Sequence, residues 1–439
     1  MKMIKQYYTP NCPECMGQTD SESINNAVKL AVQTGACKVV IPRINERTGA
    51  AEWIIDKAII LPSDIQIVLD NCYLKQAEGC FDNIFRNENF YNEDIRCKPE
   101  GEQRNIHITG IGNAVMDGWI HNGHTESTSE KDGKPHIMVN NLILMHNVDK
   151  FSITGVTMKN QRWWAIHLIF CSHGLLENIT FDANGDYPNQ DGIDVRAGCH
   201  HLTIRNIYGV CGDDVVALTG FMGFFLARKY SVEGKSHDIH HVYINNVMAC
   251  SIDYATVALR NMDGIKLYDV TIDGVTDISD GTFCKPNTMV RIGQKAWARV
   301  RTSQIGETSR IFVKNIHVNH GMAIMLNQTL SDSVISDIFC GKEAECAIST
   351  SPRSVWFKPG AILRNVTFDG IYCDAENTSQ VPLIELQKGE NHEVRESEIT
   401  KSMVEIPEYM ENVVFRNVST AKKGPAFYSE YEDGYVWEK

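Results

Sequence analysis

The sequence predicts an all-β protein: a parallel β-helix, in which short strands stack coil upon coil, with one short N-terminal capping helix. Three observations predict this fold. One amphipathic helical pattern lies near the N-terminus, many short runs rich in Val and Ile follow it, and one segment type recurs along most of the chain. Self-similarity at a spacing of about 20 to 50 residues is typical of solenoids.

The helical pattern lies between Thr19 and Gly35. Apolar residues at 24, 27, 28, 31 and 32 fall on one helical face. Asp20 or Ser21 is the expected N-cap, and Gly35 is the expected stop, because these residue types satisfy the unpaired groups at helix ends. Strands are expected in the β-type runs that follow, at 38–42, 53–55, 58–61 and 65–69.

From residue 105 onward, a short apolar segment ending in Ile or Val recurs. Its members are 105–111, 151–156, 175–179, 201–207, 242–247, 265–270, 311–316, 334–338, 363–366 and 413–418. Aligning the final Ile or Val gives spacings of roughly 22 to 28 residues, or roughly 40 to 52 where a coil is skipped or carries an insertion. Each segment is therefore expected to form a strand of one coil.

The residue before that final Ile or Val is always Gly, Asn or Asp. These corner residues are Gly110, Gly155, Asn178, Asn206, Asn246, Asp269, Asn315, Asp337, Asn365 and Asn417. These types tolerate a left-handed backbone, and stacked Asn side chains can hydrogen-bond along a solenoid axis. We expect a single domain over 1–439, with the cap and first coils over about 1–100, regular coils over about 101–420 and a C-terminal tail over 421–439.

Composition narrows the possible partners and the compartment. The net charge of −13 argues against a nucleic-acid or anionic-membrane surface. Residues 1–6 do not resemble a signal peptide, and the 14 cysteines are dispersed, so we expect reduced thiols in a cytoplasmic protein. Cys12 and Cys15 have CxxC spacing, but no second such pair completes a zinc site. We expect no cofactor.

Stacked apolar side chains fill the core of a β-helix, so a site must lie on an outer face or in insertions between coils. Candidate insertions are 119–135, 220–236 and 278–288. The apolar stretch Phe221–Ala227 within the second covers a site, forms a contact in a homo-oligomer, or packs on the chain's own body. It is too short to span a bilayer.

Three aspartates form the main candidate site. Asp191 precedes Asp213 by 22 residues and Asp214 by 23, which is one coil of the expected repeat. Adjacent strands lie about 4.8 Å apart, so these carboxylates would influence one another, and one pKa would rise. That arrangement suits acid and base catalysis of glycoside hydrolysis. Three hard oxygen ligands also suit Ca²⁺, and aspartates are common at turns, so both alternatives stay open.

The motifs around these aspartates resemble those of glycoside hydrolase family 28, the polygalacturonase-like enzymes. Asn189–Asp194, NQDGID, is similar to the family's N-T-D-G-x-D, and 212–214 is similar to its G-D-D. Residues 110–118, 158–164 and 19–42 resemble further family segments. The resemblance implies a right-handed β-helix and inverting hydrolysis without metal. It also implies that Asp213 is the general acid while Asp191 and Asp214 activate the attacking water.

Two positions depart from the family pattern. The family's G-H-G motif should fall near 254–259, where Ala255 stands and no histidine is present. The family's R-I-K resembles Arg291–Gly293, which keeps the arginine and loses the lysine. These groups help to hold a galacturonate carboxylate in typical members. The substrate expected is therefore a pectin-related glycan or another uronate- or deoxysugar-containing glycan.

Further residues are candidates for substrate binding. Asn189 and Arg291 belong to the motifs, and Arg196, Arg260 and Lys295 could supply positive charge, although each is also an ordinary solvated strand residue. Trp163 and Trp164 should alternate between the faces of a strand. One is then buried, and the other, which we take to be Trp164, stacks on a sugar ring or simply packs.

Two other functional classes compete with a hydrolase. A β-helix can bind glycans without catalysis, an alternative that the missing histidine favours mildly. A β-helix polysaccharide lyase would need a basic catalytic group and often Ca²⁺, and no convincing cluster for it is present in the sequence. A cytoplasmic enzyme would meet oligosaccharides rather than polymers, which favours exo-type cleavage.

Overall fold

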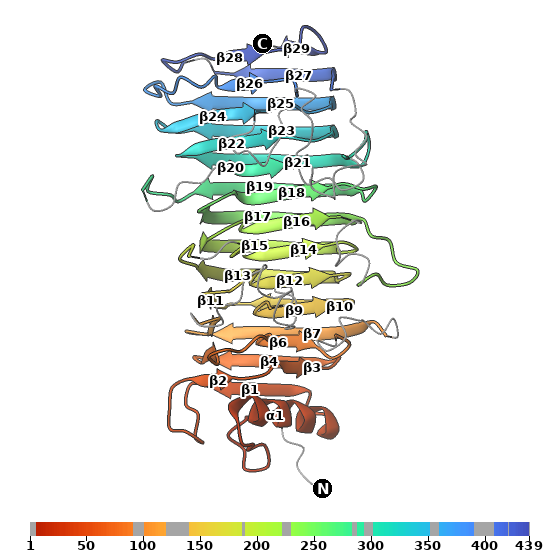
Figure 1. Cartoon of the computed structure of the whole chain (residues 1–439), viewed down its shortest axis with the longest axis vertical. Coiled ribbons are helices and arrows are strands. Elements are labelled where there is room, and N and C mark those ends of the chain that lie inside the picture. The colour runs from red at the N-terminus through yellow and green to blue at the C-terminus, as the bar shows by residue number, and fades with distance from the viewer. Residues whose placement is uncertain are drawn as a thin grey trace. The chain divides into compact units, whose positions relative to one another are not determined.

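The structure is a computed structural model that describes residues 6–90, 101–119, 140–186, 189–221, 230–282, 288–293, 302–351, 360–389, 408–419 and 421–438. The chain divides into two compact units, and Figure 1 labels its helix and strands. Unit 1 contains residues 1–194, 202–212 and 232–235, and unit 2 contains 195–201, 213–231 and 236–439. The expected single domain over 1–439 stays a prediction.

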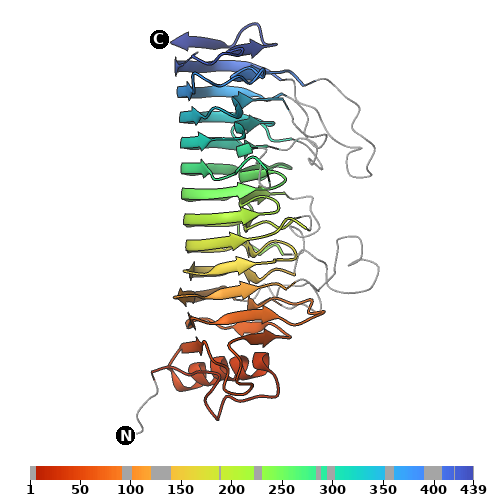
Figure 2. The ribbon, with the colours of Figure 1, turned by 90° about the vertical axis from the view of Figure 1, so that its left-hand side faces the viewer.

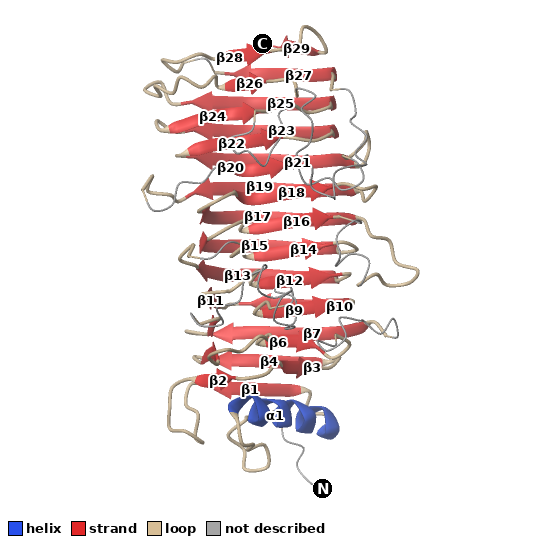
Figure 3. Ribbon diagram, in the orientation of Figure 1, coloured by secondary structure: helices blue, strands red, loops and turns tan. Residues whose placement is uncertain are grey.

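The N-terminal helix is α1 (Asp20–Thr34), drawn in blue in Figure 3. Gly35 ends it in the left-handed conformation at φ 75°, as predicted. The predicted N-cap is wrong, because Thr19 accepts the capping bond from the Glu22 amide. Asp20 is buried and bound elsewhere, since its carboxylate accepts bonds from Asn45, Arg47 and the Ile54 amide. Those partners follow the helix in sequence and the helical pattern does not reveal them.

Unit 1 is built from parallel strands in two sheets. One sheet contains β1 (Lys38–Pro42), β4 (Ile65–Asp70), β7 (Gln103–Ile111), β10 (Val148–Thr154) and β13 (Ser172–Asp182), with β2 (Trp53–Ile55), β5 (Tyr73–Gln76), β8 (Val115–Asp117) and β11 (Thr157–Lys159). The other contains β3 (Ile59–Leu61), β6 (Phe85–Asn87), β9 (Ile143–His146) and β12 (Ile166–Ile169). β14 (Ile193–Arg196) and β15 (His200–Cys211) are divided between the units.

Unit 2 repeats this arrangement, and its strands from β17 onward run from green to blue in Figure 2. One sheet contains β17 (Ile239–Ser251), β19 (Leu267–Asp277), β21 (Thr308–Val318), β23 (Leu330–Cys340), β25 (Leu363–Cys373), β27 (Met410–Val418) and β29 (Tyr435–Glu438). The other contains β16 (Val216–Gly220), β18 (Ala255–Asn261), β20 (Thr288–Ile292), β22 (Gly321–Leu326), β24 (Ala344–Ser349), β26 (Ile384–Leu386) and β28 (Phe427–Ser429). The segment expected to be a tail thus carries β28 and β29.

Columns of apolar side chains fill the space between the two sheets of unit 2. One column runs in register through six strands: Ile244, Ile272, Val313, Ile335, Phe368 and Phe415. All six are buried, and the rings of Phe368 and Phe415 stack at 4.8 Å. Because each coil buries its apolar side chains only against its neighbours, the coil must repeat the same backbone path. The predicted parallel β-helix is confirmed.

The predicted corner residues adopt the left-handed conformation in nine of ten cases, with φ between 52° and 71°. Asn178 and Asn206 show the expected stacking, since the Asn206 amide donates to Asn178 Oδ1 at 3.0 Å. Gly110 is the exception. It is required for a different reason, because a Cβ there would lie 2.1 Å from the Gly155 carbonyl oxygen.

The thiols follow the expectation with one exception. Eleven of the described cysteines, among them Cys12 and Cys15, are reduced thiols, whereas Cys250 is disulfide-bonded. The expectation of reduced thiols is therefore wrong at Cys250. Among the residues that the structure describes, no helix is long and apolar enough to cross a membrane. Residues 222–229, with most of the apolar stretch Phe221–Ala227, lie outside the described ranges. Most of the polar insertion at 119–135 does so as well.

Candidate active site

Asp191 lies in unit 1, directly before β14, and is 3% exposed. Two glutamines fix the backbone around it. The Gln190 side-chain amide donates to the Gln161 carbonyl at 2.9 Å, and the Gln161 amide donates to the carbonyls of Gln190 and Asp191 at 3.4 and 3.2 Å. The Ala165 amide also donates to the Asp191 carbonyl at 2.9 Å. The chain at Asp191 is thus held on the preceding coil.

Gly212, the first residue of the second acidic motif, is hydrogen-bonded to the first motif within unit 1. Its amide donates to the Gln190 carbonyl at 3.0 Å, so the residues before Asp191 and before Asp213 are hydrogen-bonded to each other. A Cβ at Gly212 would lie 2.9 Å from the Gln190 Cβ. Only glycine lets the two backbones approach this closely, which explains the first residue of Gly212-Asp213-Asp214.

Asp214 lies in unit 2, is fully buried, and binds two arginines. Arg260 Nη2 donates to Asp214 Oδ2 at 2.8 Å, and Arg291 Nη2 donates to both carboxylate oxygens at 3.1 and 3.0 Å. The Ala255 amide adds a bond to Oδ1 at 3.1 Å. The negative charge of Asp214 is therefore balanced by guanidinium groups that β18 and β20 place from successive coils.

Asp213 is 9% exposed, and its Oδ1 accepts a hydrogen bond from the Asp214 amide at 2.9 Å. Burial, and then the charge of Asp214, raise the pKa of Asp213 from 3.8 to about 7, although Arg260 and Arg291 act in the opposite direction. Loss of hydration disfavours a carboxylate, as does a like charge nearby. Asp213 thus holds its proton close to neutral pH, which an ordinary aspartate does not.

Tyr254 is a residue of this site that the sequence analysis missed. Its half-buried ring lies 5.2 Å from the guanidinium carbon of Arg291, and Arg291 itself is 1% exposed. Burial, and then the charge of Asp213, raise the pKa of the Tyr254 phenol. The available signal was its position next to Ala255, in the stretch where a histidine was expected.

Small residues stand at the two positions that depart from the family pattern. Ala255 belongs to a buried cluster with Ala217 and Ala258. Gly293 has a φ of 106°, and a Cβ there would lie 2.7 Å from the Asn327 carbonyl carbon. A lysine at Gly293 would be strained by both the backbone and the contact.

The other predicted binding residues are placed as follows. Asn189 lies in unit 1 with a φ of 61°. Arg196 is 7% exposed, and its guanidinium lies 5.7 Å from the centre of the Phe221 ring. Lys295 lies outside the described residues. Substrate binding by Asn189, Arg196 and Lys295 stays a prediction.

The tandem tryptophans differ from the expected alternation. Trp163 is 2% and Trp164 5% exposed, so the expectation that only one of them is buried is wrong. Trp164 meets the ring of His167 edge-on at 4.8 Å. Neighbouring aromatic rings bury both indoles, which sequence alternation alone does not reveal. Sugar contact by Trp164 stays a prediction.

The fold is a parallel β-helix, and the residues before Asp191 and Asp213 are hydrogen-bonded to each other within unit 1. Residues 91–234 match the model of Glycosyl hydrolases family 28, which confirms the resemblance drawn from the motifs. The matched segment contains Asp191, Asp213 and Asp214.

Two plant proteins are similar to parts of the chain. A Zea mays exopolygalacturonase is 32% identical over 117 residues, which is 26% of this chain and 27% of the maize protein. A probable polygalacturonase of Vitis vinifera is 27% identical over 176 residues, 40% of this chain and 30% of the grape protein. The matches therefore span less than a third of either relative.

A solved structure supports the fold. The tailspike protein of E. coli bacteriophage HK620, solved as a mutant in complex with a hexasaccharide, superposes with a TM-score of 0.56. The superposition covers 94% of this chain and 71% of the tailspike chain at 12% identity. At that identity the similarity concerns the backbone architecture alone.

The buried ion pairs of Asp214 generate a stability prediction. Arg291→Met should lower the free energy of unfolding by about 3 kcal/mol, because it leaves a buried carboxylate with one guanidinium partner fewer. Chemical denaturation followed by circular dichroism measures the loss. Asp214→Asn combined with Arg291→Met should cost less than the sum of the single variants, and strictly additive costs would show that the pair is not coupled.

Proposed function

We propose that the chain is an inverting glycoside hydrolase that uses Asp191, Asp213 and Asp214. The raised pKa of Asp213 is the observation that carries this proposal, since a carboxyl that keeps its proton near pH 7 can act as a general acid. In the reaction Asp213 gives its proton to the leaving glycosidic oxygen as the bond to the anomeric carbon breaks. A water molecule attacks that carbon from the other face and loses a proton to a carboxylate.

The hydrogen bond between Gly212 and Gln190 supports the inclusion of Asp191. Gln190 directly precedes Asp191 and Gly212 directly precedes Asp213, so each aspartate is the residue next to this backbone hydrogen bond. The required separation of acid and base in an inverting enzyme is about 6.5–9.5 Å. That separation stays a prediction, because Asp191 belongs to unit 1 and Asp213 to unit 2.

The surroundings of Asp214 favour this hydrolase over a Ca²⁺ site. Arg260 and Arg291 both donate to its carboxylate, and the Ala255 amide adds a further bond. Calcium needs six to eight oxygen ligands, and two guanidinium groups at the same carboxylate would repel the ion. In our proposal Asp214 instead keeps the charge beside Asp213 that raises its pKa, and helps to orient the attacking water.

The proposed substrate is a pectin-related oligosaccharide, or another one that contains a uronate or a deoxysugar. The partial similarity to plant polygalacturonases supports the pectic class, and the name of the maize protein supports exo-acting cleavage. Ala255 and Gly293 stand where typical members carry a histidine and a lysine, so recognition of the sugar must use other groups. We propose Asn189, Arg196, Trp164 and Tyr254 for this role.

A panel of pectic oligosaccharides tests the proposal. The protein should release reducing ends of inverted configuration, followed by proton NMR, without an increase in absorbance at 235 nm. An unsaturated product that absorbs at 235 nm would identify a lyase instead. Tight binding without turnover would identify a glycan-binding β-helix.

Asp213→Asn should lower turnover by at least about 1,000-fold, because an amide cannot donate the proton that the leaving group needs. Asp337→Asn is the matched control, since Asp337 is an exposed corner residue of β23 and other coils carry Asn at this position. The control should retain full activity. Equal activity of Asp213→Asn and wild type would exclude Asp213 as the acid.

The pH dependence of activity should follow the ionisation of Asp213. Activity should decline as the pH rises through about 7, because Asp213 loses its proton there. The free energy of unfolding should also fall as the pH rises. The Asp213 carboxyl ionises near pH 3.8 in the unfolded chain but near pH 7 in the folded chain, so wild type loses stability between pH 4 and pH 7, and the loss is complete above pH 7. Asp213→Asn should therefore gain thermal stability relative to wild type on going from pH 4 to pH 8. A difference that is constant with pH would contradict the raised pKa.

A further inference from the structure

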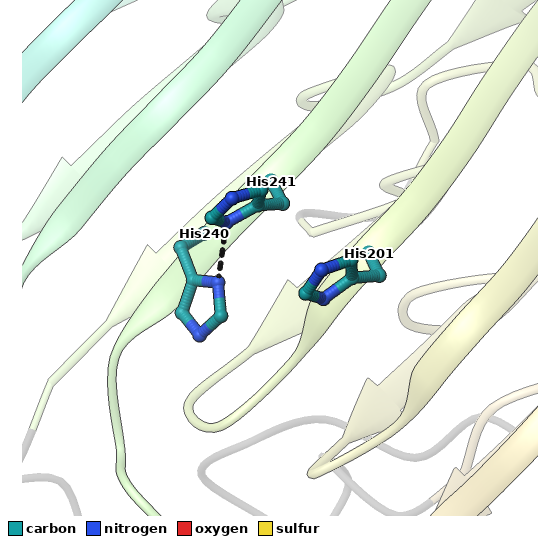
Figure 4. Close-up of side chains that lie close together, drawn as sticks. All are labelled: His201, His240 and His241. Carbon is teal, nitrogen blue, oxygen red and sulfur yellow. Dashed lines mark hydrogen bonds between the residues drawn. The ribbon is translucent and has the colours of Figure 1, made fainter.

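Two histidine pairs lie on the outer face of unit 2, apart from the acidic motifs. His200 and His201 begin β15, and His240 and His241 lie near the start of β17. Figure 4 shows His201, His240 and His241. The rings stack between the pairs: His200 on His240 at 4.9 Å, and His201 on His241 at 4.6 Å. The four imidazoles thus form a two-by-two array, which we call the histidine array.

Backbone geometry explains why both members of each pair reach the same face. Successive side chains of an extended strand point to opposite faces. His201 and His241 instead have φ values of 54° and 53°, and this left-handed turn breaks the alternation. As a result, the Nδ1 atoms of neighbouring histidines lie only 2.9 Å apart in the first pair and 2.8 Å apart in the second.

We propose that the histidine array binds one divalent transition-metal ion of the zinc class through His201, His240 and His241. One ring nitrogen from each of these residues lies within 4.8 Å of the other two. Zinc binds imidazole nitrogens at about 2.0–2.1 Å, so tetrahedral ligands lie about 3.3 Å apart. His201 and His241 are exposed, so ring rotation can close the remaining gap.

One carboxylate lies beside the array. His241 Nε2 lies 3.9 Å from Asp269 Oδ2, and a carboxylate behind a ligating imidazole orients the ring. Arg310 also donates to this carboxylate, from Nε to Oδ1 at 2.5 Å and from Nη2 to Oδ2 at 3.1 Å, and so balances its charge. Tyr268 stacks on His240 at 5.0 Å and supports that ring from the following coil.

Such an ion would fasten two successive coils, and this role does not depend on the proposed glycosidase activity. Imidazole ligands suit Zn²⁺, Ni²⁺ and Cu²⁺, whereas Ca²⁺ and Mg²⁺ prefer oxygen ligands. The alternative is that the rings stabilise the outer face by stacking alone, as aromatic ladders do. A measurement of Zn²⁺ binding by the protein distinguishes a metal site from stacking alone.

The test uses the whole chain, expressed without a histidine tag, and equilibrium dialysis against Zn²⁺ followed by elemental analysis. Wild type should bind one Zn²⁺ per chain, melt at a higher temperature with Zn²⁺ than without it, and show no such response to Ca²⁺. X-ray absorption at the zinc edge should show three imidazole ligands. Failure of wild type to bind Zn²⁺, or a zinc shell without imidazole, would overturn the proposal.

Substitutions locate the ion. His201→Asn combined with His241→Asn should weaken Zn²⁺ binding at least about tenfold, because asparagine tolerates the left-handed backbone but is a poor ligand for zinc. His173→Asn is the matched control: it is exposed, has a φ of 50°, and lies outside the array. It should bind Zn²⁺ like wild type, as should Asp213→Asn. Unchanged affinity in the double variant, or lost affinity in Asp213→Asn, would exclude the array as the site.

Discussion

The left-handed corner that recurs in each coil is the constraint on which the rest of the structure depends. A column such as Ile244, Ile272 and Val313 stays in register only if every coil turns at the same place. Asn, Asp and Gly accept that conformation at low cost, whereas other residue types pay about 1–2 kcal/mol. Stacking side-chain bonds, such as that from the Asn206 amide to Asn178 Oδ1 at 3.0 Å, then join one corner to the next. The corner residues thus set the register of the coils without backbone strain.

This register also creates the electrostatics of the acidic site. Arg260 and Arg291 are 46 and 77 residues from Asp214 in the sequence, yet both reach its carboxylate because β16, β18 and β20 are consecutive strands of one sheet. Their positive charge makes burial of Asp214 tolerable. A buried, ionised Asp214 in turn makes ionisation of its neighbour Asp213 costly. Burial, and then the charge of Asp214, raise the pKa of Asp213, whereas the two arginines that coil stacking brings to Asp214 lower it.

The parts of the fold that were predictable from the sequence are those set by local chemistry. Gly35, the strands from Lys38 to Asp70 and the Asn corners follow from propensity and periodicity. Asp20 did not cap its helix because Arg47 and Ile54, more than 25 residues away, bind its carboxylate. Arg260 and Arg291 were recognisable as positive charges near the site, but their common partner depends on the coil register. The histidine pairs at 200 and 240 are 40 residues apart and flank the insertion at 220–236, so their spacing did not indicate that they lie on successive coils.

The histidine array arises from the coil spacing of the fold. Side chains at equivalent positions of successive coils lie about 5 Å apart, so a side chain that is repeated on the next coil lies in contact with its counterpart. In the histidine array this spacing brings ring nitrogens of His201, His240 and His241 within 4.8 Å of one another. Core positions cannot use this property, because they must stay apolar for the coils to pack. New chemistry in such a chain is therefore expected on the outward faces and at the left-handed corners, where substitution leaves the apolar columns intact.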